Sequence, residues 1–234
     1  MRAWLVIASV TLVACGGPSH APLHALAGEP TDHDEDAAPL VLGSTTLPPL
    51  PVSVHASDEV VSEALRLARE AILPERPALD DAATNEETAR YMREDFQAWV
   101  VSRARAIGSA RTALSAMEHG EPDEHVLASA LVGTLFAMLA REVQETPLPR
   151  VVRDDRSQRV LVREALLEAA APLYRRALAG FGVCSSTAAG AADPSLEPWA
   201  SYCDDASERA EQAPHPVDDA PASAEPSAPS SATP

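Results

Sequence analysis

The chain has 234 residues, of which 18 are Lys or Arg and 35 are Asp or Glu, so its formal net charge at pH 7 is −17. A protein this acidic is not expected to bind nucleic acid, because phosphate groups are held by basic side chains. All of its basic residues are arginines. Schiff-base lysines, Walker-type phosphate loops and Ser-x-x-Lys nucleophile pairs are therefore excluded.

The beginning of the chain has the pattern of an export signal. Arg2 gives a positive start, residues 3–13 are mostly apolar, and the segment closes with Leu12-Val13-Ala14-Cys15. This quartet resembles the lipobox of bacterial lipoprotein signals, and the resemblance implies cleavage before Cys15 and acylation of its sulfur and amine. An ordinary secretory signal with a chance cysteine is the alternative. The apolar run is shorter than the roughly 20 residues that span a bilayer.

The same resemblance implies where the mature protein resides. Residues 1–14 would be removed, and Cys15 would hold the protein to a lipid bilayer of the cell envelope, facing the periplasm or the cell surface. Gly16 rather than Asp follows the cysteine, which under the sorting rule of enteric bacteria favours the outer membrane. With lipid on Cys15, Cys184 and Cys203 remain as an even pair in an oxidising compartment, where a disulfide is expected.

Residues 15–56 are predicted to form a flexible, acidic and Pro-rich tether, because such a segment buries too little apolar surface to fold. The short run 40–42 is apolar and leaves open whether it packs on the domain. Residues 32–36 place acids at alternate positions, as in a calcium loop. Ala37 and Gly43 stand where that loop needs Gly and Glu, so the calcium interpretation fails.

Residues 57–212 are predicted to fold as an all-α domain, an antiparallel bundle of about four to five helices. The first helix is expected to have Ser57 as its N-cap and to end before Pro74, since the residue before proline avoids the helical conformation. Apolar residues at steps of three and four predict one buried face. They are Val61, Ala64, Leu65, Ala68 and Ile72.

The second helix is predicted to open with a capping box formed by Thr84 and Glu87. A heptad seam follows and predicts a helix to about residue 118, with Gly108 as a point where it can kink. The seam consists of Met92, Phe96, Trp99, Arg103, Ala106, Ala110, Ala113 and Met117. The arginine on this seam either pairs with a carboxylate from a neighbouring helix, extends outward to water or faces a ligand.

The third helix is predicted to be the centre of the bundle. Pro122 suits its first position, and residues 126–140 carry no charge, which is typical of a buried helix. His119 and His125 lie near its start among several acids. Such residues are metal ligands in principle, but their spacing matches no metal motif. They are candidates for a metal site, and no metal or other cofactor is predicted.

A loop rich in Arg and Pro is predicted at 146–156, followed by a fourth helix from about Ser157. The arginines at the start of this region form a basic patch in an acidic chain. They are Arg150, Arg153, Arg156, Arg159 and Arg163. The patch is a candidate site for an anionic partner or lipid headgroups. The alternative is that nearby acids neutralise it in surface ion pairs that contribute little.

The fourth helix is expected to kink at Pro172 and to end at Gly180 and Gly182. Ser195 is then predicted to cap a fifth helix, whose buried face steps through Trp199, Cys203, Ala206 and Ala210. A disulfide between Cys184, at the end of one helix, and Cys203, in the next, would join the two helices. Residues 213–234 are rich in Pro, Ala and Ser and are predicted to be disordered.

Two short segments resemble a tetratricopeptide hairpin: Val132-Gly133 with Phe136, and Tyr174 with Ala177-Leu178. The match covers about a tenth of the chain and breaks where the repeat expects Ala. It is consistent with helical hairpins but not with an array. The common catalytic and haem motifs are also absent from the sequence.

The sequence therefore predicts a membrane-anchored envelope lipoprotein whose helical bundle is a non-catalytic scaffold or binding module for another envelope protein. A bundle that binds a small ligand or a metal ion is the alternative. An enzyme whose site is assembled without a recognisable motif is a third hypothesis.

Overall fold

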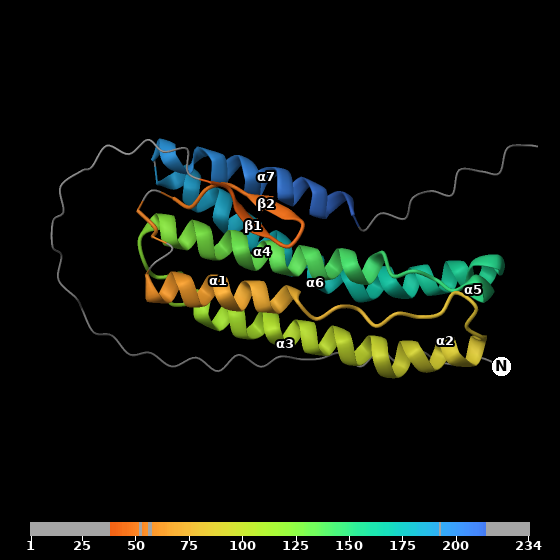
Figure 1. Ribbon diagram of the computed structural model, residues 1–234. Coiled ribbons are helices and arrows are strands. Elements are labelled where there is room, and N and C mark those ends of the chain that lie inside the picture. Colours follow the sequence, from red (N-terminus) through yellow and green to blue (C-terminus); the bar gives the residue numbers. More distant parts are fainter. Residues whose placement is uncertain (1–37, 52, 56–57, 192, 214–234) are drawn as a thin grey trace, which may run out of the picture.

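The computed structural model describes residues 38–51, 53–55, 58–191 and 193–213. The described chain is a helical bundle with one small β-hairpin, so the predicted fold class is confirmed (Figure 1). The signal segment, Cys15, residues 16–37 and residues 214–234 lie outside the described residues. The hairpin is β1 (Leu40–Leu42) and β2 (Thr45–Leu47), and the α-helices are α1 (Glu59–Ile72), α2 (Asn85–Tyr91), α3 (Gln97–Leu114), α4 (Pro122–Gln144), α5 (Arg150–Asp154), α6 (Arg156–Gly190) and α7 (Glu197–Gln212).

Helix α4 is the centre of the bundle, as predicted. It packs against α6, α3, α7 and α1, and nearly every residue between Val126 and Ala140 is buried. The helix has 23 residues, more than its uncharged stretch suggests. Length and composition alone would allow it to cross a membrane, but 78% of its most apolar stretch is buried inside the bundle. That burial is the pattern of a core helix.

Helix α6 does not end where the sequence predicted. It runs for 35 residues through Pro172, Gly180 and Gly182. Gly180 lies against α4: a Cβ there would come within 2.8 Å of the Gly133 nitrogen and 2.9 Å of the Ser129 oxygen. The glycine is therefore required for a close approach of two helix backbones rather than for a helix end. Nothing lies within 4 Å of a Cβ at Gly182.

The predicted second helix is interrupted near its start rather than at Gly108. The capping box of Thr84 and Glu87 is present, but a π-helical segment, Met92–Phe96, joins α2 to α3. Helix α3 then continues through Gly108 to Leu114. In its second half Ile107 and Leu114 are buried instead of Ala106 and Ala113, because a straight helix drifts away from a strict seven-residue repeat.

The arginine on the seam of α3 joins three helices. Arg103 is 1% exposed, and it donates hydrogen bonds to the Ala71 carbonyl near the end of α1 and to Oε1 of Glu142 on α4, the latter at 2.8 Å. Burial holds the pKa of Arg103 below its usual value, while Glu142 opposes this shift. Of the sequence alternatives, the structure shows the ion pair with a neighbouring helix.

Part of the predicted tether belongs to the domain. Residues 40–47 form an antiparallel hairpin, in which Leu42 and Leu47 are 2% and 1% exposed. Gly43 has a φ of 59° in its tight turn, a conformation that glycine adopts without strain. Trp199 Nε1 on α7 donates to the Pro49 carbonyl at 2.9 Å. The folded region therefore begins near residue 40, because the apolar side chains of this hairpin complete the core.

The disulfide between Cys184 and Cys203 is present, with a Cα–Cα distance of 6.2 Å. Cys184 lies inside α6 rather than at a helix end. Before α7 a 3-10 turn, Pro194–Leu196, is capped by the side chain of Asp193, not by Ser195 as predicted. The predicted buried face of α7 is confirmed in full.

The N-cap of α1 is Asp58, one position after the predicted Ser57, which lies outside the described residues. The predicted loop at 146–156 contains the short helix α5.

Gly180→Ala should destabilise the protein, because backbone atoms of Gly133 and Ser129 on α4 already occupy the space that the added methyl group needs. Overpacking of this kind costs about 1–3 kcal/mol. Gly182→Ala is the matched control: it lies two residues away on the same helix with open space around it, and it should be neutral or stabilising by up to ~1 kcal/mol. Urea denaturation followed by circular dichroism measures both. Equal stability of the two variants would contradict the close contact of α4 and α6.

Reduction of the Cys184–Cys203 bond should lower the stability of the α6–α7 pair. The two cysteines are 19 residues apart, and closing a loop of this length contributes about 3 kcal/mol in the chain-entropy model. The measurement is thermal unfolding with and without reductant, together with the intact mass, after alkylation, of the protein purified from its producing cell. Two alkylatable thiols at these positions without reductant would show that the bond does not form.

Candidate functional site

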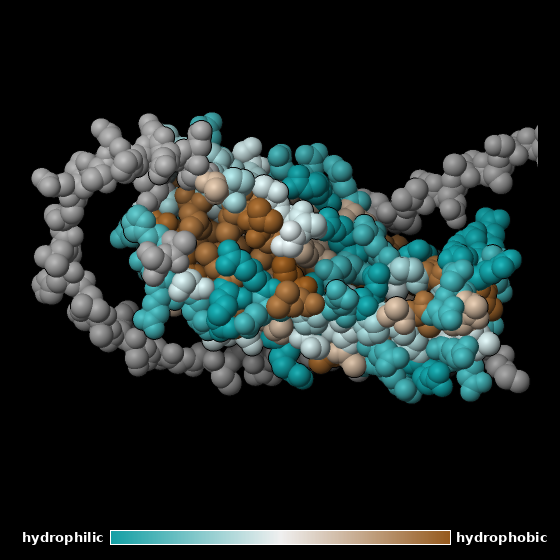
Figure 2. Space-filling view, in the orientation of Figure 1, coloured by the Kyte–Doolittle hydropathy of each residue, from teal (hydrophilic) through white to brown (hydrophobic). Residues whose placement is uncertain are grey.

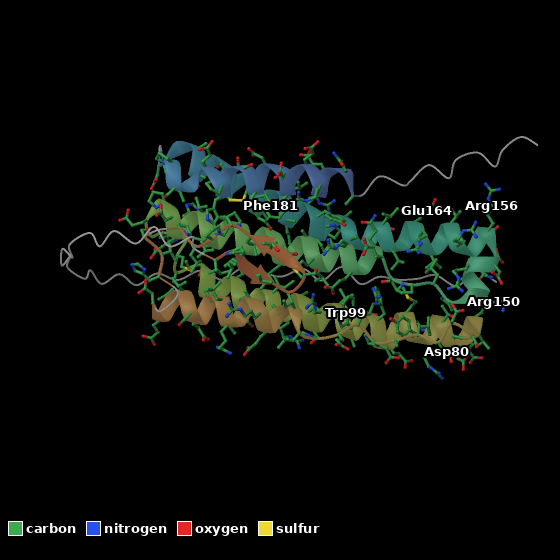
Figure 3. The ribbon with its side chains drawn as sticks, turned by 45° about the horizontal axis from the view of Figure 1, so that its top comes forward. Asp80, Trp99, Arg150, Arg156, Glu164 and Phe181 are labelled. Atoms are coloured by element: carbon green, nitrogen blue, oxygen red, sulfur yellow. A yellow bond between two sulfur atoms is a disulfide. The ribbon has the colours of Figure 1, made fainter. Side chains whose placement is uncertain are left out.

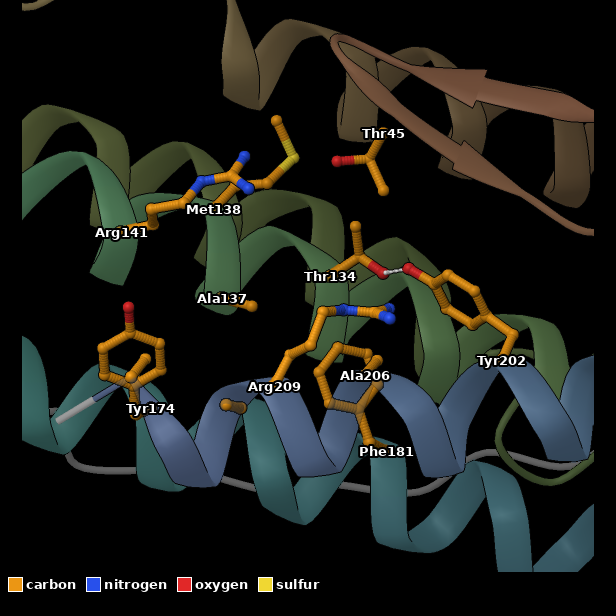
Figure 4. Close-up of a pocket in the computed structure, with 12 residues that line it drawn as sticks. Thr45, Thr134, Ala137, Met138, Arg141, Tyr174, Phe181, Tyr202, Ala206 and Arg209 are labelled. Carbon is orange, nitrogen blue, oxygen red and sulfur yellow. Dashed lines mark hydrogen bonds between the residues drawn. The ribbon is translucent and has the colours of Figure 1, made fainter. Parts of the chain in front are cut away.

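A cavity of about 220 Å³ opens between α4, α6, α7 and the hairpin (Figure 4). Its described lining combines apolar side chains, hydroxyl groups and two arginines. The lining residues are Thr45, Thr134, Ala137, Met138, Arg141, Tyr174, Phe181, Tyr202, Ala206, Arg209, Ala210 and Ala213. The cavity thus has walls from four elements that are distant in the sequence.

Two hydroxyl groups meet in the cavity wall. The Thr134 hydroxyl donates to the Ala130 carbonyl one turn earlier on α4, and it lies 2.8 Å from the Tyr202 hydroxyl of α7. Because the threonine proton is already engaged, Tyr202 is the donor to Thr134. Burial raises the pKa of Tyr202 above its usual value. This phenol therefore stays neutral at physiological pH and ties α7 to α4.

Arg141 and Arg209 supply the charge of the cavity. Figure 4 shows Arg209 reaching from α7 toward α4, while Arg141 extends from α4 beside Met138. Both side chains are exposed, and neither makes an ion pair with a described residue. The described lining contains no Asp or Glu. The cavity is therefore a locally basic site in an acidic protein.

The described lining contains neither His nor Cys. His, Cys and carboxylates are the commonest general bases and activated nucleophiles, and tyrosine is a less common one. The Thr134–Tyr202 pair links α4 to α7, and its tyrosine has a raised pKa. The arrangement can bind and orient a small ligand.

The predicted arginine patch lies on α5 and the first turns of α6, at one end of the bundle (Figure 3). Arg150 pairs with Asp154 at 3.3 Å, and Arg153 pairs with Asp81 at 2.6 Å. The hydrogen bond to Asp81 holds the pKa of Arg153 above its usual value. These contacts correspond to the neutralised surface that was the alternative interpretation.

Two other arginines of the patch bind backbone carbonyls. Arg159 donates to the Arg153 carbonyl at 2.6 Å. Arg163 donates to the Gln144 and Thr146 carbonyls at 3.0 and 3.2 Å, so it caps the end of α4, where carbonyl groups lack helical partners. The structure therefore uses most of the patch to join α4, α5 and α6. Arg156 lies exposed at the start of α6.

The two histidines that were metal candidates are not gathered into a site. His119 is exposed after α3, and His125 is half-buried in the first turns of α4. Within the described residues there is no group of three or more His, Cys, Asp or Glu side chains that could hold a metal ion. The acidic segment 32–36 lies outside the described residues.

Sequence reasoning did not single out the cavity. Its residues come from β2, α4, α6 and α7, and each one fits an ordinary helix or strand pattern. The one available signal was a pair of arginines, Arg141 and Arg209, near the ends of helices with strongly apolar faces.

No protein-family model, no curated protein and no solved structure matches the chain. The site is therefore interpreted from its own chemistry. The resemblances to lipoprotein signals and to a tetratricopeptide hairpin stay predictions.

Proposed function

We propose that the protein is a lipoprotein anchored through Cys15 in a bacterial cell envelope, where its helical bundle binds another envelope protein without catalysis. The signal sequence supports export. The disulfide of Cys184 and Cys203 also supports it, because such bonds persist in oxidising compartments. With these two cysteines joined, Cys15 is the one cysteine left for acylation.

The surface over the hairpin is the observation that supports binding of a protein partner. Figure 2 shows hydrophobic residues gathered on the face where Figure 1 places β1 and β2. Val41 on β1 is 54% exposed. The sheet has only these two strands in the described chain, so each strand has an outer edge without a strand partner. An exposed strand edge beside apolar side chains is a surface to which a partner strand can add.

The anchor suits this surface because the hairpin is the first described element after Cys15. Residues 16–39 would connect the lipid to β1, and as a flexible coil a segment of this length extends roughly 27 Å. The hairpin would therefore lie within reach of proteins embedded in, or attached to, the same membrane.

Val41→Asp should reduce cross-linking of the protein to its partner in intact envelopes, since it places a charge in the apolar surface over the hairpin. Leu161→Asp is the matched control, because Leu161 is also exposed, at 65%, but lies on α6 near α5. The measurement is chemical cross-linking in envelopes followed by purification from detergent. A monomer without cross-links, or identical cross-links in both variants, would contradict partner binding at the hairpin.

Cys15→Ala should abolish labelling of the protein by a radioactive or clickable fatty acid, since the sulfur that would carry lipid is gone. The double variant Cys184→Ser/Cys203→Ser retains Cys15 and should still be labelled. Gel autoradiography or fluorescence of both variants in the producing cell measures the label. Labelling that survives Cys15→Ala would end the lipoprotein assignment.

The cavity favours a second function, binding of a small ligand within the bundle. The lack of His, Cys, Asp and Glu from its described lining favours a ligand held by arginines and apolar contacts over a metal ion. The hypothesis of an enzyme gains no support from this lining.

A further inference from the structure

The cavity has the two chemical parts that an amphiphilic anion requires. Phe181, Met138 and several alanines give it an apolar wall, and Arg141 and Arg209 stand at its edge (Figure 4). Both are cations in a chain whose net charge is −17. A cation without an acidic partner favours binding of an anion from solution.

Four described arginines are held in ion pairs: Arg66, Arg103, Arg150 and Arg153. Arg103 is held by Glu142 and Arg153 by Asp81, and Arg66 pairs with Glu63 and Glu70. Arg141 and Arg209 belong to the larger group that makes no ion pair within the described chain, and they differ from the rest of that group in lining the cavity. Among the described residues no acidic side chain occupies their donors, so these donors can bind a carboxylate, which the planar guanidinium fork matches.

We infer that the cavity binds a small organic carboxylate with a short apolar chain. The carboxylate lies between Arg141 and Arg209, and the apolar chain lies against Phe181 and Met138. The Thr134–Tyr202 hydrogen bond closes the polar part of the wall. This inference names the ligand of the second candidate function and rests on it. It does not depend on a protein partner at Val41.

The size of the cavity limits the length of the ligand. Its volume of about 220 Å³ is below the roughly 300–1,000 Å³ of pockets that hold drug-sized ligands. It corresponds to about seven water molecules at ~30 Å³ each. A chain of about six carbons is therefore the matching probe.

The experiment titrates the mature full-length protein in detergent with sodium hexanoate by isothermal calorimetry, with the same titration into detergent buffer subtracted. Hexan-1-ol and hexylammonium chloride, of equal chain length, are titrated in parallel. Hexanoate should bind, and its affinity should fall as salt rises, because the charged groups at the cavity edge are exposed to solvent. Hexanol and hexylammonium should bind at least tenfold more weakly.

Arg209→Gln and Arg141→Gln should each weaken hexanoate binding about tenfold, the effect of losing one hydrogen bond to a charged group. Arg105→Gln is the matched control, because it removes the same charge from an exposed position on α3 and should leave binding unchanged. Ala137→Leu should block the cavity, and its melting temperature shows whether the variant remains folded. A folded Ala137→Leu variant that binds hexanoate as well as the wild type would overturn the assignment to this cavity.

The remaining outcomes separate the alternatives. If hexanol or hexylammonium binds better than hexanoate in this cavity, ligand binding stands but the carboxylate inference is wrong. If none of the three binds to the wild type or to the Asp218→Asn/Asp219→Asn variant, both the inference and the second candidate function are wrong.

The chain itself also supplies carboxylates after Ala213, at Asp218 and Asp219. Hexanoate binding that appears only in Asp218→Asn/Asp219→Asn would mean that the chain's own acidic segment competes for the site, and would overturn the inference for a free ligand.

Discussion

The contact of α4 with α6 at Gly133 and Gly180 is the constraint on which the rest of the structure depends. Side chains cannot fit between the two backbones there, since a Cβ on Gly180 would meet the Gly133 nitrogen at 2.8 Å. The next residue on each helix, Thr134 and Phe181, lines the cavity. The same close approach that builds the core therefore fixes two walls of the candidate site, and both helices are too tightly packed to shift independently.

The elements predicted correctly are those that depend on neighbours in the sequence. The capping box of Thr84 and Glu87 needs only residues three positions apart, and the central helix follows from a long uncharged run. Gly180 was misread because a helical glycine has the same local pattern whether it ends a helix or admits another backbone. The two roles can be distinguished only when the position of α4 is known, and the contacting residue there, Gly133, lies 47 positions earlier in the sequence. The hairpin was assigned to the tether for the same reason: Leu42 and Leu47 become core residues only through helices that come later.

The cavity could not be predicted from the sequence, because each residue that lines it fits an ordinary helix or strand pattern when considered alone. Arg141, Tyr174 and Arg209 lie on three helices, and nothing local indicates that they face one space. The disulfide was different: once the lipobox resemblance sets Cys15 aside, counting cysteines leaves one pair, and the structure joins it. In the arginine patch, four of the five side chains form ion pairs or bind backbone carbonyls, partly through Asp81 and the end of α4, and the sequence alone left this open beside an anion site.

The disulfide also supports the geometry of the candidate site. Helix α7 supplies Tyr202 and Arg209 to the cavity, and Cys203 directly follows the tyrosine. Because α7 is joined to α6 by this bond, oxidation holds the tyrosine and arginine opposite the α4 wall. The Thr134–Tyr202 hydrogen bond and the contact of Gln144 Nε2 with the Ala213 carbonyl at 2.6 Å fix α7 noncovalently on the same side. A compartment that oxidises Cys184 and Cys203 thus stabilises both the C-terminal helix and the geometry of the cavity.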